Sequence, residues 1–312
     1  MKGIAWLAVL SIGLSFAAFA EGLGRWTTGS PMPSARSEVA VAAVAGKVYV
    51  VGGFGGVRDL EIYDPATDRW SQGAPVPRAL HHVAALDTGD KLYVIGGYAD
   101  GWNPTDSVYE YDPKLDLWRL LAPLPTARGA LAAVALDGKI HAIGGTGSGR
   151  RSTPAHEVYD PASDTWTARA ALPTPRDHLA AAVVDGRIYV IGGRIDGSYA
   201  RNLPANEEYD LATDSWHSRA RMPTARSGIA AAVIDGEILI FGGEAPSGTF
   251  DEVEGYDPEA DSWTGYASMP TARHGLGVTV VTGRAYVISG GTWPGGTRPG
   301  GSASSLNEIF SR

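Results

Sequence analysis

The apolar positions of this 312-residue chain fall into short runs that recur along its length. A run of small residues, as at 179–184, is followed by a tight turn and a second run that ends in two glycines, as at 187–193. A third run ends in Tyr-Asp-Pro or a close variant, and a fourth carries a tryptophan. Three of the tight turns read Asp-Gly, which favours two-residue hairpins because both positions need a positive φ. Each unit therefore predicts four antiparallel strands, and the chain predicts an all-β fold.

The unit recurs six times and its ends meet. The glycine doublets begin at 52, 96, 144, 192, 242 and 290. A tryptophan precedes a proline by seven residues in each unit, but Trp26 has no Tyr-Asp-Pro before it. Conversely, residues 306–310 have the pattern of a third strand, but no sequence typical of a fourth strand follows them. We expect the N-terminal segment to supply that strand, which closes the array into a ring and leaves only short sheet edges.

The doublets, the Tyr-Asp-Pro motifs and the spaced tryptophans resemble kelch repeats over residues 24–310. Six such repeats imply a six-bladed β-propeller whose sixth blade is closed by the N-terminal strand. We expect a single propeller domain over residues 21–312. Its blades are expected at 34–77, 78–125, 126–173, 174–223, 224–270 and, for the sixth, 271–312 together with 21–33.

Composition limits the partners and the chemistry. The chain has 34 acidic against 26 basic residues, a net charge of −8, which disfavours a nucleic-acid partner. It has no cysteine, which excludes disulfides, thiolate metal sites and a cysteine nucleophile. We expect no cofactor and a monomer.

The first twenty residues have the pattern of an export signal. Lys2 precedes an apolar run, and Ala18-Phe19-Ala20 fits the small-residue cleavage pattern. We therefore predict a signal peptide over residues 1–20 and a periplasmic or secreted protein, with no membrane span after its removal. The alternative is an uncleaved membrane anchor, although the run is short for one.

The loops that follow the glycine doublets vary in length, whereas the turns on the opposite face are uniform. The variable loops share one face of the ring and carry large aromatic residues, among them Phe54, Tyr98, Trp102 and Trp293. Aromatic side chains in loops on a rigid scaffold are typical of recognition sites. We predict that these four contact a ligand; the alternative is that the loops fold back and bury them.

Five units have an arginine three residues after the proline and a glutamate two residues before the third-strand aromatic, and the second unit lacks both. The shared gap favours structural ion pairs, because a paired arginine is largely neutralised. We assign this role to Arg128, Arg176, Arg226 and Arg273 and to Glu61, Glu157, Glu207, Glu254 and Glu308. Kelch proteins that grip acidic peptides use arginines at this position, and that resemblance implies ligand contact for Arg36.

Two residues after that arginine, where kelch repeats usually have glycine, the chain has Glu38, His82 and His178. These side chains are expected at the mouth of the central channel, where they could bind a metal ion or act as acid and base. Ring positions on different blades are expected to lie too far apart to share one ion. We therefore predict no metal site and include His82 and His178 among the ligand contacts.

Two functions remain open. The leading hypothesis is a binding module that presents its variable loop face to a protein, peptide or glycan. The alternative is a sugar-processing enzyme, because the leader, the six units and residues 243–246 resemble the N-acetylneuraminate epimerase family. That resemblance implies acid–base catalysis by Glu244 with an arginine a few residues later. Residues 247–250 lack the arginine, so Arg194 or Arg226 would have to hold the substrate carboxylate.

Overall fold

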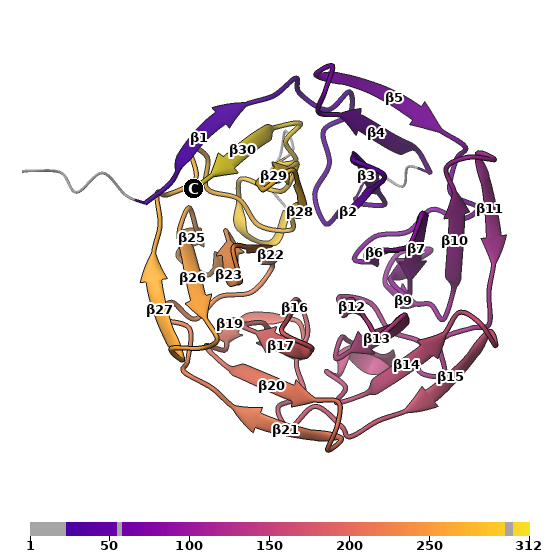
Figure 1. The fold of residues 1–312 in the computed structure, drawn as a ribbon, viewed down its shortest axis with the longest axis vertical. Helices are drawn as coiled ribbons and strands as arrows, with labels where there is room; N and C mark the ends of the chain where they lie inside the picture. The colour runs from indigo at the N-terminus through magenta and orange to yellow at the C-terminus, as the bar shows by residue number, and fades with distance from the viewer. Residues whose placement is uncertain (1–22, 55–57, 297–301) are drawn as a thin grey trace, which may run out of the picture.

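The computed structural model describes residues 23–54, 58–296 and 302–312. Six four-stranded antiparallel sheets are arranged around a central axis within this part of the chain (Figure 1). The prediction of an all-β, six-bladed propeller is therefore confirmed. The predicted signal peptide, residues 1–20, lies outside the described residues. No helix among the described residues is long and apolar enough to cross a membrane.

Each blade runs from an inner strand beside the axis to an outer strand at the rim (Figure 1). The inner strands are β2 (Ala40–Val44), β6 (Ala84–Thr88), β12 (Ala132–Leu136), β16 (Ala180–Val184), β22 (Ala230–Ile234) and β28 (Gly277–Val281). The second strands are β3 (Lys47–Val51), β7 (Lys91–Ile95), β13 (Lys139–Ile143), β17 (Arg187–Ile191), β23 (Glu237–Phe241) and β29 (Arg284–Ile288).

The two outer positions of each blade follow the same order. The third strands are β4 (Leu60–Asp64), β10 (Val108–Asp112), β14 (His156–Asp160), β20 (Asn206–Asp210), β26 (Val253–Asp257) and β30 (Asn307–Ser311). The outermost strands are β5 (Arg69–Gly73), β11 (Leu117–Leu120), β15 (Thr165–Ala168), β21 (Ser215–Ser218), β27 (Ser262–Gly265) and β1 (Arg25–Thr28).

The N-terminal strand closes the ring, as the unmatched Trp26 predicted. β1 pairs with β30 in the order β1-β30-β29-β28, with Trp26 opposite Phe310. The first and last described segments of the chain therefore share one sheet, and neighbouring inner strands are in contact all the way around the axis.

Glycines and aspartates adopt the backbone conformations that the turns require. Asp185 and Gly186 both have positive φ, 49° and 72°, as expected for the two-residue hairpin. In the doublets, Gly96 has φ 63°, and a Cβ there would lie 2.5 Å from the backbone carbonyl oxygen of Arg128. A glycine is needed at this position because the backbone of the next blade approaches it closely.

Tyrosine and tryptophan side chains join neighbouring blades. Tyr209 is fully buried beside Trp216, with 5.1 Å between the ring centroids. The Trp216 indole Nε1 donates a hydrogen bond to the carbonyl oxygen of Ala170 in the preceding blade, at 2.8 Å. The other five blades repeat this bond from Trp26, Trp70, Trp118, Trp166 and Trp263. Each bond satisfies the polar end of a large apolar side chain, so burial of the ring carries no polar penalty.

All five predicted Arg–Glu pairs are present. The arginine side chains are at most 1% exposed, and Arg176 Nη1 lies 2.5 Å from Glu207 Oε2. The other pairs are Arg36–Glu61, Arg128–Glu157, Arg226–Glu254 and Arg273–Glu308. In the second blade Leu80 and Tyr109 take these positions and belong to the apolar core.

The third blade has a buried histidine pair. His141 Nδ1 lies 2.9 Å from His156 Nε2, and the exposed fractions of the two residues are 1% and 2%. Burial, reinforced by the neighbouring histidine, lowers the pKa of His141 to about 3, and burial lowers the pKa of His156 to about 4. Both rings are therefore neutral in the folded protein at neutral pH.

Removal of one member of a buried ion pair should destabilise the protein. We expect Arg226→Leu to cost about 3–5 kcal/mol, because Glu254 is left as an unpaired buried charge. Arg226→Leu/Glu254→Tyr imitates the second blade and should regain most of this loss. The free energy of unfolding in urea measures both. A single variant as stable as the double variant would contradict the structural role of the pair.

The histidine pair predicts a loss of stability in acid. In the unfolded chain His141 and His156 become protonated as the pH falls below their ordinary pKa of about 6.5. In the folded protein the two rings stay neutral down to about pH 4. Stability is therefore retained above pH 6.5 and lost as the pH falls. The double variant His141→Tyr/His156→Asn copies Tyr189 and Asn206 of the next blade. When the pH is lowered from 6.5 to 5, its free energy of unfolding should fall by about 2–3 kcal/mol less than that of the parent protein. Parallel losses in urea unfolding would contradict this.

Candidate functional site

One position in each blade, two residues after the start-of-blade arginine or its equivalent, lies around the axis. Its occupants are Glu38, His82, Ala130, His178, Gly228 and Gly275. All six have a left-handed backbone, with φ between 53° and 66°. The N–H of each donates to the carbonyl oxygen of the same position in the preceding blade, over 2.7–3.2 Å. The six bonds form a closed ring, which we call the axial hydrogen-bond ring.

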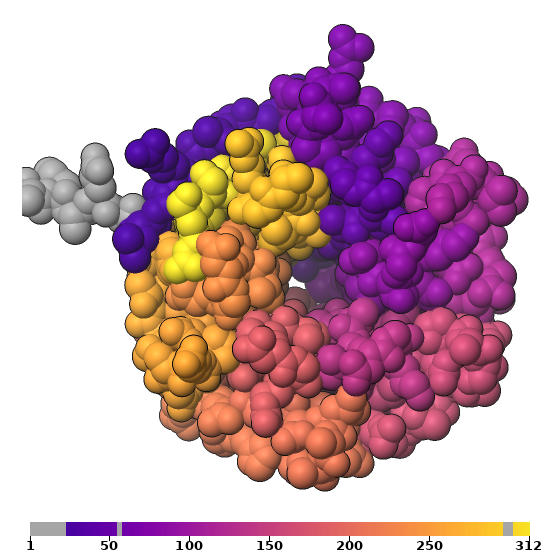
Figure 2. Space-filling view, in the orientation of Figure 1, coloured from indigo at the N-terminus to yellow at the C-terminus, as the bar shows by residue number. Residues whose placement is uncertain are grey.

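The axial hydrogen-bond ring surrounds a narrow mouth that leads into the central channel. The mouth encloses about 80 Å³ and is lined by the ring residues and by apolar side chains such as Leu131 and Leu179. Figure 2 shows that the molecule is hollowed at the centre of its blades. We call the ring and the polar side chains that meet over it the axial mouth.

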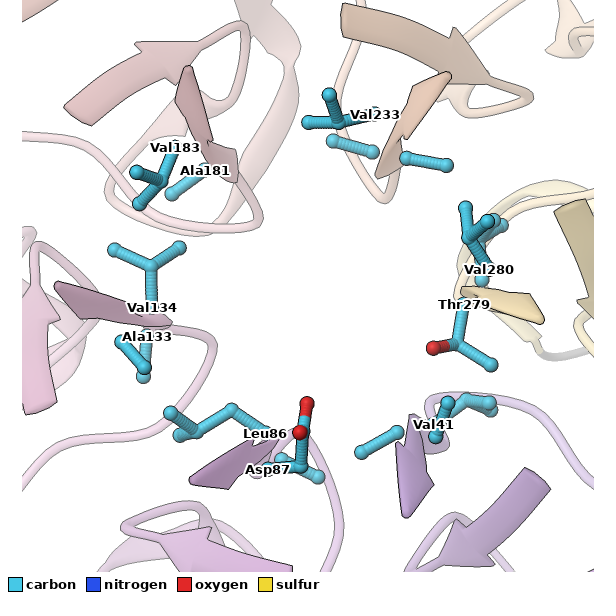
Figure 3. Close-up of a pocket in the computed structure, with 17 residues that line it drawn as sticks. Val41, Leu86, Asp87, Ala133, Val134, Ala181, Val183, Val233, Thr279 and Val280 are labelled. Carbon is cyan, nitrogen blue, oxygen red and sulfur yellow. The ribbon is translucent and has the colours of Figure 1, made fainter. Parts of the chain in front are cut away.

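The channel widens away from the mouth to a cavity of about 480 Å³. Its walls are alanine and valine side chains of the inner strands, and the labelled polar groups that face it are those of Asp87 and Thr279 (Figure 3). This wider cavity has the larger volume but few groups able to do chemistry. The polar side chains converge at the mouth instead.

Glu38, His82 and His178 form one half of the polar cluster. Each is less than 9% exposed, and their nearest ligand-type atoms all lie within 4.8 Å of one another. His82 Nε2 lies 3.2 Å from Glu38 Oε2. His178 Nδ1 donates to Asp177 Oδ1 at 2.6 Å, and His178 Nε2 accepts a bond from Arg194 Nη2 at 2.6 Å.

The hydrogen bonds also fix the tautomer of His82. His81 Nε2 lies 2.7 Å from the carbonyl oxygen of Gly101, which can only accept, so this nitrogen carries the proton. His81 Nδ1 is therefore an acceptor, and His82 Nδ1, 2.6 Å away, must be the donor. His82 Nε2 is left with its lone pair directed at Glu38, as His178 Nε2 has its own directed at Arg194.

Arg194, Glu244 and His274 form the other half. Arg194 Nη1 lies 2.5 Å from Glu244 Oε1, and the N–H of Gly295 donates to Glu244 Oε2 at 2.7 Å. His274 Nε2 lies 3.4 Å from Glu244 Oε2 and 3.6 Å from Glu38 Oε1, so it connects the two halves. Arg194 and Glu244 begin the short hairpins β18 (Arg194–Ile195)–β19 (Ser198–Asn202) and β24 (Glu244–Ala245)–β25 (Gly248–Thr249).

The two glutamates have opposite protonation states because their partners differ. Burial, and next the charge of Glu244, raises the pKa of Glu38 to about 8. Burial also acts to raise the pKa of Glu244, but His274, Arg194 and the Gly295 N–H together lower it. Glu38 is therefore neutral at pH 7 and is able to donate to His82, whereas Glu244 is a carboxylate.

The histidines of the cluster are neutral and their acidic partner is ionised. Burial lowers the pKa of His82 well below its usual value, with help from His178, and it lowers that of His274 to about 4. Burial would raise the pKa of Asp177, but the hydrogen bonds from His178 and Ser152 bring it down to about 2. The axial mouth thus offers lone pairs and a carboxylate in a buried setting.

Three loops that carry aromatic side chains lie beside the axial mouth. Phe54 lies 5.2 Å from His82 and 5.5 Å from Trp102, measured between ring centroids. Trp102 belongs to the hairpin β8 (Tyr98–Ala99)–β9 (Asn103–Pro104) and is 46% exposed, while Tyr98 beneath it is 4% exposed. Trp293, which precedes the turn η2 (Pro294–Gly296), is 50% exposed. The loops therefore bury one of their aromatic residues and present two to solvent.

The structure places the sequence-predicted residues in two groups. The residues that converge at the axial mouth are Phe54, Tyr98, Trp102, His82, His178, Arg194 and Glu244. Trp293 belongs to the loop whose Gly295 contacts Glu244. Arg36, which we had placed among the ligand contacts, instead points into its blade. It is 1% exposed and bonds to Glu61, Ser34 and two backbone carbonyls, as a structural arginine does.

The structure distinguishes the two arginines considered for a substrate carboxylate, and it changes one expectation about distance. The guanidinium of Arg226 is buried against Glu254, whereas Arg194 Nη1 meets Glu244. Glu38, His82 and His178 were expected to lie too far apart to share an ion, but they lie within 4.8 Å of one another. Sequence reasoning did not select Asp177 and His274 as site residues. They directly precede the ring residues of their blades, and their departure from the serine or glycine that three other blades have at this position was the available signal.

The comparisons with known proteins agree with the fold. A family model for the KLHDC2/KLHL20/DRC7 Kelch-repeats domain matches residues 73–219 and 132–310, and one for the Kelch motif matches residues 35–77. A solved structure titled "Structure of YjhT" superposes with a TM-score of 0.78 at 16% identity and covers 91% of this chain and 97% of that chain. At this identity the likeness shows the fold alone. A search of curated proteins finds no match.

Proposed function

This chain belongs to the kelch-repeat family, and we propose that it is an exported binding module whose axial mouth takes a carbohydrate. The signal-like first twenty residues support export. One observation carries the choice of site: half-exposed tryptophans stand on loops around a buried polar cluster. The loop face of the ring is where the blades differ, and the scaffold beneath it is rigid.

Carbohydrates suit both parts of the axial mouth. Sugar rings have apolar faces that stack on indole rings, and Trp102 and Trp293 are 46% and 50% exposed. Sugar hydroxyls donate and accept hydrogen bonds, and the Glu244 carboxylate and the His82 and His178 ring nitrogens supply partners for them. Polar groups placed precisely among apolar walls are the usual composition of small-molecule sites.

The tryptophans should determine affinity. We expect Trp102→Ala and Trp293→Ala each to weaken carbohydrate binding about 30-fold, or about 2 kcal/mol, because truncation of an anchoring tryptophan costs at least that much. Leu117→Ala is the control, since Leu117 is 62% exposed on β11 at the rim. Calorimetric titration with neutral sugars, uronic acids and sialic acid measures the effect. No binding of any sugar would leave a protein partner as the better hypothesis.

A second candidate is acid–base chemistry on a sugar. What supports this candidate is that Arg194 of the neighbouring blade has its Nη1 2.5 Å from Glu244 Oε1, although residues 247–250 lack an arginine. Glu244 is 1% exposed and keeps its negative charge, as a general base must. His274, 3.4 Å from Glu244, is placed to pass a proton to or from it. Interconversion of sugar anomers needs only such proton transfers.

This candidate predicts a loss of rate without loss of fold. Glu244→Gln should slow anomer exchange, followed by NMR, about 10²–10⁴-fold, the usual contribution of a general base. Glu259→Gln is a matched control, because Glu259 is exposed in the outer turn of the same blade. Two results would refute the catalytic role and leave the binding role unaffected. One is an unchanged rate of anomer exchange in Glu244→Gln, and the other is a rate with the parent protein that does not exceed the rate in buffer.

A further inference from the structure

The geometry points to a divalent transition-metal site at the axial mouth, formed by Glu38, His82 and His178. These three residues come from the first, second and fourth blades and project from the axial hydrogen-bond ring. The inference goes beyond the proposed function, since an ion would bind here whether or not a carbohydrate does.

The ligand atoms are close to the spacing that an ion imposes. Zinc lies about 2.0–2.1 Å from histidine nitrogen and carboxylate oxygen, so tetrahedral ligand atoms are about 3.3 Å apart. His82 Nε2 and Glu38 Oε2 are already 3.2 Å apart. All three ligand atoms lie within 4.8 Å of one another, so small side-chain rotations would complete the set.

Each histidine is oriented as a metal ligand by a second partner. Asp177 accepts the Nδ1 proton of His178, which leaves Nε2 with a lone pair for an acceptor role. His81 accepts the Nδ1 proton of His82 and has the same effect. A carboxylate or other acceptor behind each ligating imidazole is the usual arrangement in metal sites.

Charge in the surroundings favours a dication. Among the described residues, the buried cluster contains the carboxylates of Asp177 and Glu244 against the guanidinium of Arg194, and Glu38 adds a third carboxylate when it gives up its proton to an ion. Arg194 Nη2 donates to the Nε2 lone pair of His178, which an incoming ion would take over. Arg194 would retain its contacts with Glu244, at 2.5 Å, and Asp177, at 3.5 Å.

The backbone gives an independent indication. Glu38, His82 and His178 have φ of 56°, 53° and 53°, in the left-handed region where Gly228 and Gly275 occupy the equivalent positions. A side chain held there costs about 1–3 kcal/mol, and such strain concentrates at functional sites. Three large polar residues at positions suited to glycine are therefore better explained by a ligand than by packing.

The ligand set also selects the class of ion. Two imidazoles and one carboxylate suit zinc, iron and neighbouring transition metals, whereas calcium and magnesium prefer all-oxygen sites. Three protein ligands leave one tetrahedral position unfilled, as in sites where a metal ion contacts a substrate.

Glycine variants test the site without endangering the fold. Chelator-treated protein should bind one equivalent of Zn²⁺ by calorimetry, and Ca²⁺ should not compete. His82→Gly and His178→Gly should each lower the Zn²⁺ affinity at least 100-fold, more than the 10–100-fold expected for the positioning change Asp177→Asn. Since glycine is the residue of two other blades at this position, both variants should fold. Ala130→Gly, at the same position in the third blade, is the matched control and should keep the parent affinity.

Several results would overturn the inference: no Zn²⁺ uptake by the parent, uptake unchanged in His82→Gly/His178→Gly, or an equal loss in Ala130→Gly. Co²⁺ provides a second readout, because its absorption spectrum reports nitrogen ligation and should change in both histidine variants. Carbohydrate titrations with and without Zn²⁺ keep the two proposals apart. Sugar binding without Zn²⁺ binding would refute only the metal site, and Zn²⁺ binding without sugar binding would refute only the proposed function.

Discussion

The axial hydrogen-bond ring is the constraint on which the site depends. Each blade contributes one N–H and one carbonyl to a closed circle of six bonds, and no blade can move along the axis without breaking two of them. The geometry requires a left-handed backbone at every contributing residue. Glycine meets this requirement at little cost. Where the chain has glutamate or histidine instead, the same bonds hold that side chain over the mouth, next to side chains from other blades.

Scaffold and site lie only two residues apart in each blade. The start-of-blade arginine points into the blade, where its glutamate neutralises it, and the ring residue points to the axis. The buried Arg–Glu pairs hold each blade together internally. The tryptophan bonds join neighbouring blades near the rim, and the axial hydrogen-bond ring joins them at the centre. Side chains at the axial mouth are thereby held in place before any ligand arrives. A site with rigid support loses little entropy on binding.

The loops complete what the ring begins. Arg194 and Glu244 follow the glycine doublets of the fourth and fifth blades, and the sixth blade's Gly295 reaches across to Glu244. These contacts join residues 50 or more positions apart in the sequence. They also leave Glu244 ionised while burial keeps Glu38 neutral, so two glutamates in one cavity have different protonation states.

The repeats made the fold predictable, and the differences among repeats indicated much of the site. The doublets, the spaced tryptophans and the unmatched strand at each end were sufficient for six blades and their closure. The joint absence of Arg and Glu from the second blade was sufficient for the ion pairs. Arg36 was misplaced because its repeat position allowed two roles, and only its contacts distinguish them.

Distances across the axis could not be predicted in the same way. They depend on the left-handed φ at Glu38, His82 and His178, and residues of these types rarely adopt it. Asp177 and His274 were missed because their importance comes from partners on the same or other blades, and repeat alignment does not reveal partners. Which aromatic side chains of the loops stay exposed, as for Trp102 against Tyr98, also depends on packing that a pattern does not encode.

The protonation of the axial histidines tests the central claim most directly, namely that the axial mouth is built to present lone pairs to a ligand. Long-range ¹⁵N–¹H NMR of the histidine side chains distinguishes the two neutral tautomers in metal-free protein. We predict that His82 and His178 both carry their proton on Nδ1 at pH 7 and leave Nε2 free to accept. Protonation of either ring on Nε2, or a charged ring at that pH, would contradict this description of the site.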